Sequence, residues 1–277
     1  MAKLFFSRYT ITSGQQYTDK FDFLLNGLKN EAKTTYRNYV YRFFDTEVFE
    51  YEGKEFIAGH LVKYNPEDME EVVDEATRKL RDENLRNKVE GKARFIVDPS
   101  SSILMFFEVS NVISKNTFID KFCKLFEENQ GNFFTQFYIS PIKEQYSFIE
   151  KVRSFKAVKR IVIILFPSNP NFADRWRSID ERLRKNNINK YREIQENTES
   201  ESRIIVDEET ESKFLMSEDG YGKSDATGIN EDGEEKTIST KDNEKIVTKP
   251  VPNDLQKAVD ILKIVAETLQ EIVNRTK

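Results

Sequence analysis

The chain has 277 residues, a formal net charge of −5 at neutral pH, 38% hydrophobic residues and 33% charged residues. This length suits one large domain or two smaller ones. The single cysteine, Cys123, excludes an internal disulfide and fits a reducing compartment. The longest apolar run, residues 161–167, is too short to span a bilayer, and the first residues lack the apolar stretch of a signal peptide. We therefore expect a cytoplasmic protein without a membrane segment.

The first 64 residues predict a strand, a helix and a hairpin. Alternating apolar residues indicate a strand over 3–12, and apolar residues at helical spacing indicate a short helix over 18–30. Residues 37–64 alternate again around a turn at Gly53, which is typical of paired strands.

A helix start is predicted next, at Asn-Pro-Glu-Asp over 65–68, because this stretch combines a capping residue, a first-turn proline and acids that favour the helix dipole. Apolar residues at helical spacing would form the inner face of that helix: Met69, Val72, Val73, Ala76 and Leu80.

Three further elements complete a predicted N-terminal α/β module over residues 1–140. Two apolar strands, 93–98 and 102–109, flank a turn that begins at Asp98. Ser114 can cap a helix with Phe118 and Phe122 on its inner face, and a strand is expected over 133–139.

The second part of the chain, 141–277, is predicted as a basic strand–helix unit with an acidic insertion and a terminal helix. A helix near 143–155 precedes an apolar strand over 160–166. A helix near 171–186 follows, with Phe172, Trp176, Ile179 and Leu183 on its apolar stripe. Short strands are expected over 202–206 and 213–216, within a loop-rich insertion over 196–250, and a long helix over 253–275. The predicted fold class is α+β, with a mixed or antiparallel sheet.

A charge boundary near Arg192 is the strongest functional signal. Residues 151–192 carry twelve Lys/Arg and three Asp/Glu, a balance of +9, whereas 196–235 carry three Lys/Arg and fourteen Asp/Glu, a balance of −11. A basic stretch that contains aromatics favours an anionic polymer, and we expect double-stranded DNA bound without sequence preference. The predicted phosphate contacts are Arg153, Lys156, Lys159, Arg160, Arg175, Arg177, Arg182, Arg184, Lys185, Lys190 and Arg192.

Other interpretations of both charged segments stay open. The basic residues would pair with Asp174, Asp180, Glu181 or the acidic insertion if they only form a solvated helix face, and an acidic protein partner is a further alternative. The acidic insertion can be interpreted as a flexible, solvated loop, or as a nucleic-acid mimic that lies over the basic surface. Its Asp and Glu residues over 207–211 lack the spacing of a calcium loop.

Catalytic motifs are weak, so we expect a protein that is not an enzyme and needs no cofactor or metal. The single histidine, His60, lies on a predicted strand, and Cys123 lies among core residues. No nucleophile elbow, phosphate loop or dinucleotide motif is present. Asp98, Glu108 and Lys121 leave a metal-dependent nuclease as an alternative.

The C-terminal helix has a continuous apolar face that must be covered. It either docks onto its own domain or pairs with a second copy of the chain. We expect a homodimer, formed through this helix or through the sheet module, and a partner protein from the same operon is an alternative to nucleic acid.

The layout of the chain resembles the RexA-like phage-exclusion proteins and a related group encoded on mobile elements. The features that carry the resemblance are Phe23-Leu24-Leu25-Asn26 with the strands around 51–56, the strand that ends in Phe166-Pro-Ser-Asn-Pro170, and Gly220-Tyr-Gly222 with 227–228 and 239–241. The resemblance implies a dimeric, non-enzymatic DNA-binding protein that acts in phage defence. This chain departs from that layout in its strongly acidic insertion.

Overall fold

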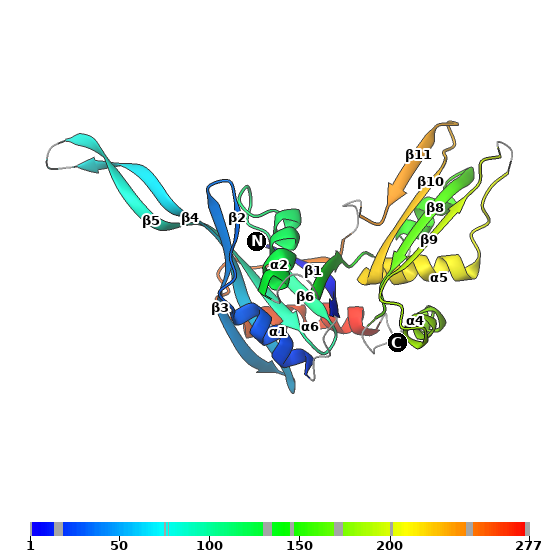
Figure 1. Ribbon diagram of the computed structural model, residues 1–277, viewed down its shortest axis with the longest axis horizontal. Helices are drawn as coiled ribbons and strands as arrows, with labels where there is room; N and C mark the ends of the chain where they lie inside the picture. The colour runs from blue at the N-terminus through cyan, green and yellow to red at the C-terminus, as the bar shows by residue number, and fades with distance from the viewer. Residues whose placement is uncertain are drawn as a thin grey trace.

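The protein folds into two lobes and a projecting arm (Figure 1). The computed structural model describes residues 2–13, 19–74, 76, 78–129, 135–144, 147–168, 174–199, 202–241 and 246–274. The first lobe contains most of the chain up to residue 142, and residues 143–241 form the second. The chain then returns to the first lobe, so the second lobe is an insertion in the first.

One antiparallel sheet is the centre of the first lobe. Its strand order is β12-β1-β6-β5-β4-β3-β2, and β7 also pairs with β1. The strands are β1 (Ala2–Ser13), β2 (Thr34–Tyr36), β3 (Tyr39–Tyr51), β4 (Lys54–Asp74), β5 (Lys79–Asp98), β6 (Ile103–Phe107), β7 (Thr135–Pro141) and β12 (Thr248–Val251).

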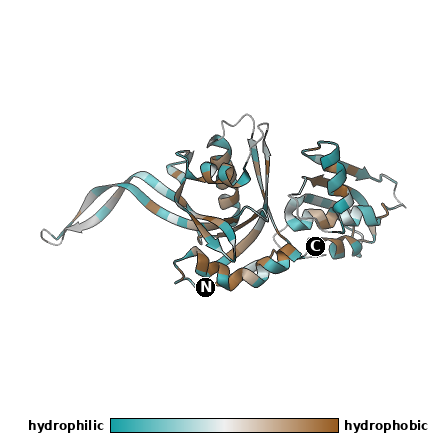
Figure 2. Ribbon diagram, turned by 90° about the horizontal axis from the view of Figure 1, so that it is seen from below, coloured by the Kyte–Doolittle hydropathy of each residue, from teal (hydrophilic) through white to brown (hydrophobic). Residues whose placement is uncertain are grey.

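Helices cover both faces of this sheet, so the first lobe has three layers (Figures 1 and 2). Helices α1 (Lys20–Lys29) and α2 (Lys115–Asn129) pack on one face, where the rings of Phe106 and Phe118 stack 4.1 Å apart. Helix α6 (Ala258–Asn274) packs on the other, with Leu262 and Val265 buried against Leu4 and Phe6. The apolar face of α6 is therefore covered within its own chain, which is the first of the two alternatives expected for it.

Local sequence signals locate most of these elements. Strand β1 and helix α1 match the expected ranges, and the Asp19 side chain caps α1 by accepting from the Phe21 amide at 2.7 Å. Ser114 caps the next helix as predicted, because its Oγ accepts from the Thr117 amide at 3.2 Å. The hairpins of β3 with β4 and of β5 with β6 are also confirmed.

The helix predicted from residue 65 is wrong, because these residues extend strand β4 instead. Strands β4 and β5 stay paired out to Asp74 and Lys79, and beyond Tyr64 they pair only with each other among the described strands. This two-stranded ribbon, residues 65–88, is the arm at the left of Figure 1. Met69, expected in a helix core, is 64% exposed. Regular cross-strand hydrogen bonding has overridden the capping signal.

The second lobe is a four-stranded sheet with helices on one face. The strand order is β11-β10-β8-β9. The strands are β8 (Ala157–Leu165), β9 (Tyr191–Glu196), β10 (Gly222–Ile229) and β11 (Glu235–Ser239), and the helices are α3 (Ser147–Arg153), α4 (Arg177–Lys185) and α5 (Glu208–Met216). Trp176, Ile179 and Leu183 are buried with Ile161 and Ile163 of β8, so three residues of the expected stripe are confirmed. Phe172 lies outside the described residues.

The described part of the acidic segment contains regular elements of this lobe, which corrects the expected loop-rich insertion. It contains α5, a π-helical turn η1 (Ser217–Tyr221) and strand β10. Residues 202–206 are irregular and 213–216 lie in α5, so the two short strands predicted there are wrong. The division at residue 140 also changes, because β12 and α6 belong to the first lobe. None of the helices in the described part of the chain is long and apolar enough to cross a membrane.

Candidate functional site

A buried arginine joins the two lobes. Arg8 of β1 is 2% exposed, and its guanidinium donates to the Asp219 carbonyl at 3.3 Å and to the Ser101 carbonyl at 2.6 Å. The same guanidinium lies 5.2 Å from the ring centre of Tyr221. Because Asp219 and Tyr221 belong to η1, this contact fixes the second lobe against the first sheet. We call this contact between Arg8 and η1 the joint.

Two glycines in and beside η1 allow close packing, Gly220 between the lobes and Gly222 within the second lobe. Gly220 has a φ of +90°, and a Cβ there would lie 2.7 Å from Cγ of Arg8. A Cβ at Gly222 would lie 2.0 Å from the Ile164 carbonyl oxygen. A larger residue at position 220 would push the two lobes apart, and one at position 222 would push β10 away from β8 within the second lobe.

Two acidic residues of η1 are buried at this joint, although the sequence suggested solvated acids. Glu218 is fully buried, and its Oε1 accepts from the Phe148 amide at 2.6 Å and from Ser147 Oγ at 3.0 Å. Burial raises the pKa of Glu218 to about 7. Asp219 accepts from the Trp176 indole at 3.1 Å. The acids therefore tie η1 to α3 and α4.

Beside the joint, a cavity of about 530 Å³ opens between the lobes. Of its described lining residues, five are lysines and none is Asp or Glu. Lys115 comes from the first lobe, and the other four lysines come from the second lobe, namely Lys143, Lys190, Lys223 and Lys241. We call this cavity the lysine cleft.

The fold of each lobe places these lysines. Lys115 is the first residue of α2, and Lys143 follows β7, where its amide donates to the Glu218 carbonyl at 2.9 Å. Lys223 lies on β10 opposite Ile164, and Ile164 also pairs with Arg192 of β9. The row Arg192–Ile164–Lys223 thus extends the positive surface across the sheet face that is opposite the helices.

The lysines of the cleft differ in how far their side chains are exposed to solvent. Lys190 and Lys241 are exposed, whereas Lys143 is 4% exposed. Lys223 lies 2.8 Å from Asp225, which partly offsets its charge. Burial lowers the pKa of Lys115, and Glu108 opposes this shift. The outer lysines therefore carry most of the field that a ligand would meet.

Apolar side chains form the rest of the wall. Ile119, Ile139, Ile164 and Phe166 line the cleft together with Tyr138, whose ring stacks on Phe166 with centroids 4.5 Å apart. Neutral polar groups complete the lining, namely Asn116, Ser140, Ser217 and Thr240. The cleft combines cations, an aromatic surface and neutral hydrogen-bonding groups.

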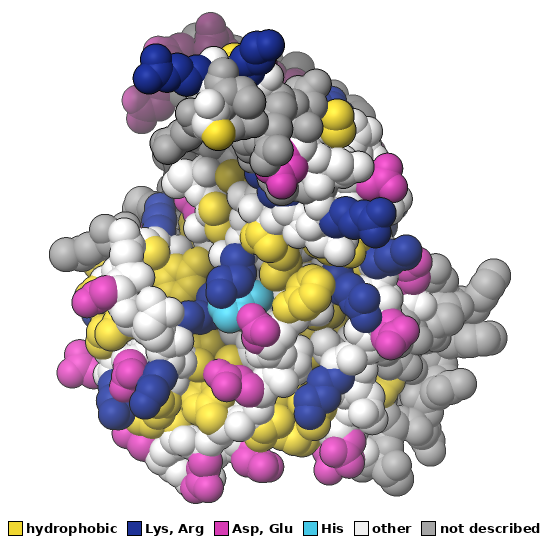
Figure 3. All heavy atoms as spheres, turned by 90° about the vertical axis from the view of Figure 1, so that its left-hand side faces the viewer, with side chains coloured by type: hydrophobic (Ala, Val, Ile, Leu, Met, Phe, Trp, Pro, Cys, Tyr) yellow, Lys and Arg dark blue, Asp and Glu magenta, His cyan; other side chains and the backbone are white. Residues whose placement is uncertain are grey.

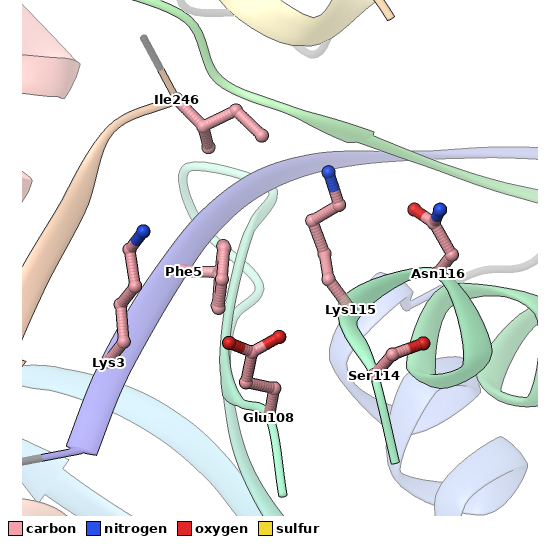
Figure 4. Close-up of a pocket in the computed structure, with 7 residues that line it drawn as sticks. All are labelled: Lys3, Phe5, Glu108, Ser114, Lys115, Asn116 and Ile246. Carbon is pink, nitrogen blue, oxygen red and sulfur yellow. The ribbon is translucent and has the colours of Figure 1, made fainter. Parts of the chain in front are cut away.

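A second cavity, of about 340 Å³, adjoins the cleft and shares Lys115 and Asn116 with it. Figure 4 shows Lys3 and Lys115 on either side of Phe5 and Glu108. The carboxylate of Glu108 makes this cavity less favourable for an anion than the lysine cleft.

Most of the sequence-predicted basic residues do not meet on one surface, because acids and carbonyls engage them. Ion pairs join Arg153 to Glu211, Arg160 to Glu196, Arg177 to Asp174, Arg182 to Glu209 and Arg184 to the buried Asp180. Lys159 donates to two backbone carbonyls, of Glu199 and Ser202. Lys156, Arg175 and Lys185 are exposed elsewhere on the lobe.

Helix α5 explains much of this pairing. Its acids Glu209 and Glu211 meet arginines of α4 and α3, as the acid-pairing interpretation expected. Of the predicted residues, Lys190 lines the cleft and Arg192 lies in the adjoining row. Sequence reasoning missed Lys115, Lys143, Lys223 and Lys241, because each is an isolated lysine in its own segment.

The three residues considered for a nuclease site do not form a shared cluster, and two of them make ordinary structural contacts. Asp98 accepts from Ser100 and Ser101 in its turn, and Lys121 pairs with Asp120 at 3.1 Å. Glu108 lines the smaller cavity. Among the described side chains, no group of three or more His, Cys, Asp or Glu could hold a metal ion.

The histidine and the cysteine are both half-buried. Nδ1 of His60 lies 3.2 Å from Asp45, while burial and the neighbouring Lys92 and Arg94 lower the pKa of His60 to about 4. Figure 3 shows the histidine at the surface, next to basic and acidic side chains. Burial raises the pKa of the Cys123 thiol, so it stays protonated at neutral pH.

A family model described as a domain of unknown function, DUF4747, matches residues 4–267. The chain belongs to this family. The match covers both lobes and most of α6, so the insertion and the returning helix are part of the family's domain. Among curated proteins no match is found.

Proposed function

We propose that this protein is a non-enzymatic nucleic-acid-binding protein that holds the phosphate backbone in the lysine cleft. The observation that carries the proposal is the convergence of five lysines from both sides of the joint on one cavity whose described lining has no acid. Phosphate is the anion that repeats along every nucleic acid, and lysines bind it by charge rather than by base sequence.

The location of the proposed surface differs from that expected from the sequence. Five arginines of residues 151–192 have acids of the same lobe as partners, so a phosphate would have to displace an existing ion pair there; they are Arg153, Arg160, Arg177, Arg182 and Arg184. At the cleft, Lys190 and Lys241 are exposed, and Arg192 extends the positive row along the sheet. DNA remains the proposed ligand, and the cleft replaces the arginine helix as its principal contact.

A comparison of two triple variants tests this proposal. One variant carries Lys190→Ala, Lys223→Ala and Lys241→Ala, and the matched control carries Arg153→Ala, Arg177→Ala and Arg182→Ala. Each removes three positive charges, so the net charge of the two proteins is equal. Binding of a fluorescently labelled DNA is measured by anisotropy over a range of salt concentrations.

The cleft variant should bind at least tenfold more weakly and lower the slope of log affinity against log salt by about 2 to 3. The arginine variant should stay within about twofold of the parent protein. Weakening confined to the arginine variant would return the site to residues 151–192. If the parent protein does not bind DNA or RNA, the proposal is wrong.

The biological setting of this activity is also a proposal. The resemblance to RexA-like proteins supports a role in phage exclusion, in the cytoplasm where phage DNA is present. Plaque counts on cells that express the parent protein or the cleft variant test this role. Protection that survives in the cleft variant would separate defence from nucleic-acid binding.

The arm favours protein–protein interaction as a second candidate function. A two-stranded ribbon is marginally stable alone in water, and this one exposes Met69 and Leu80 at 64% and 60%. We propose a second copy of the chain as its partner, because α6 does not offer a free apolar face. Replacing residues 66–87 with an Asn-Gly turn should convert a dimer to a monomer in sedimentation velocity. A parent protein that is already monomeric would exclude this function.

A further inference from the structure

The chemistry of the lysine cleft is more specific than a positive charge. A site for phosphate alone would need cations and amide groups, yet this wall also presents Ile119, Ile164 and the stacked pair of Tyr138 and Phe166. A matching ligand must have an apolar, flat part and an anionic part within one cavity. A nucleotide combines a planar base with phosphate.

The size of the cleft indicates whether that nucleotide is unpaired or part of a duplex. A volume of about 530 Å³ lies within the range of small-ligand sites, roughly 300–1,000 Å³. The duplex major groove alone is about 12 Å wide, and paired bases are stacked inside the helix where a protein ring cannot cover their faces. An unpaired base exposes its face and can stack on an aromatic side chain.

We propose that the lysine cleft binds an unpaired nucleotide, with its base stacked against Tyr138 and its phosphates between Lys190, Lys223 and Lys241. This inference rests on the proposed function and narrows its ligand to single-stranded nucleic acid. The half-buried ring of Tyr138 supplies the stacking surface, and the ring of Phe166, which also lines the cleft, stacks on it with centroids 4.5 Å apart. Asn116, Ser140 and Thr240 offer neutral groups to the edges of the base and the sugar.

Binding of three probes to three proteins tests the inference. The probes are a labelled twelve-residue oligothymidylate, a hairpin duplex with the same number of phosphates, and ATP. The proteins are the parent, Tyr138→Leu, which removes the ring, and Tyr138→Phe, which keeps it. Tyr36→Leu is the matched control, because Tyr36 is 53% exposed and lies outside the residues that line the cleft.

The single strand should bind more tightly than the duplex, and Tyr138→Leu should weaken single-strand binding by at least about fivefold, since one base–aromatic stack is worth roughly that factor or more. Tyr138→Phe and Tyr36→Leu should stay within twofold of the parent. Equal binding of both polymers, unchanged in Tyr138→Leu, would overturn the unpaired nucleotide and leave nucleic-acid binding intact. No binding of either polymer would overturn the proposed function, and ATP binding that depends on Tyr138 would then assign the cleft to a free nucleotide.

Photo-crosslinking gives a second measurement that needs no variant. An oligonucleotide that contains 5-bromouracil is irradiated with the parent protein, and the linked peptides are identified by mass spectrometry. A crosslink within β7 at Tyr138 supports the inference. Crosslinks confined to α4, away from Tyr138, would contradict it even if Tyr138→Leu failed to fold.

Discussion

The arginine-rich segment and the lysine cleft are both positive, but only one is arranged to receive a ligand. The arginines lie close together in the sequence, and α5 brings Glu209 and Glu211 to two of them. The lysines are scattered from residue 115 to residue 241, yet the joint between the lobes gathers them around one cavity. Local charge density in a sequence therefore does not measure the potential at a surface, because the folded chain decides which charges are already paired.

The largest effect on the lysine cleft should come from weakening the joint, because the joint aligns the two sides of the cleft. Replacing Arg8 with Met leaves the carbonyls of Asp219 and Ser101 without their buried donor. Such a loss costs about 3 kcal/mol of unfolding free energy. Urea unfolding of Arg8→Met should show this loss, with the exposed Lys156→Met as control. Binding at the cleft should weaken too, because its two sides lose their alignment, and unchanged stability would contradict the proposed role of the joint.

Protonation of Glu218 should alter the same joint in a pH-dependent way. Its pKa is raised to about 7 from an ordinary value of 4.5, so the folded state favours the neutral carboxyl. Stability is fully present below about pH 4.5 and falls as the pH rises through 7, by up to about 3 kcal/mol. Glu218→Gln should remove this dependence and be more stable than the parent at pH 8. Urea unfolding at pH 5, 6.5 and 8 measures the difference, and parallel curves for the two proteins would exclude a buried, titrating Glu218.

A single lysine of the cleft should matter more than a single exposed lysine of the basic segment. Lys241→Ala removes one phosphate contact and should weaken DNA binding about fivefold, with a salt slope reduced by about 0.7 to 0.9. Lys185→Ala carries the same change in charge on α4 and should alter affinity by less than twofold. Equal losses would show that the whole lobe attracts DNA without a defined cleft.

The smallest expected effect is the coupling within an exposed ion pair of the arginine-rich segment, residues 151–192. Arg182 and Glu209 are 47% and 52% exposed and lie 3.2 Å apart. A double-mutant cycle with alanine at both positions should give a coupling below about 1 kcal/mol, and less in high salt. A coupling clearly above about 1 kcal/mol that persists in high salt would contradict this expectation.

Sequence patterns located the elements whose signals are local. Strand β1, helix α1 and the capped start of α2 were predictable because alternation, helical spacing and N-caps act within a few residues. Residues 65–74 misled the prediction, since a helix cap and a strand compete there and the pairing with β5 prevails.

The site was much less predictable than the strands, because its contacts are distant in the chain. Glu218 looks like a solvated acid until Ser147 and Phe148, about 70 residues earlier, are placed against it. Arg8 contacts Asp219 across 211 residues of sequence. Only Lys190, and the adjoining Arg192, had a local signal, which was the basic composition of 151–192.

The return of the chain to its first lobe has a consequence for synthesis on the ribosome. Leu4 and Phe6 of β1 are made before the inserted lobe, but the helix that covers them, α6, is made after it. Until α6 emerges, one apolar face of the growing sheet has no partner within the chain. Domains generally fold as units during translation, so the first lobe must wait for residues 258–274, whereas the inserted lobe can fold while the other is incomplete. Premature termination before α6 should therefore yield aggregates rather than a soluble fragment.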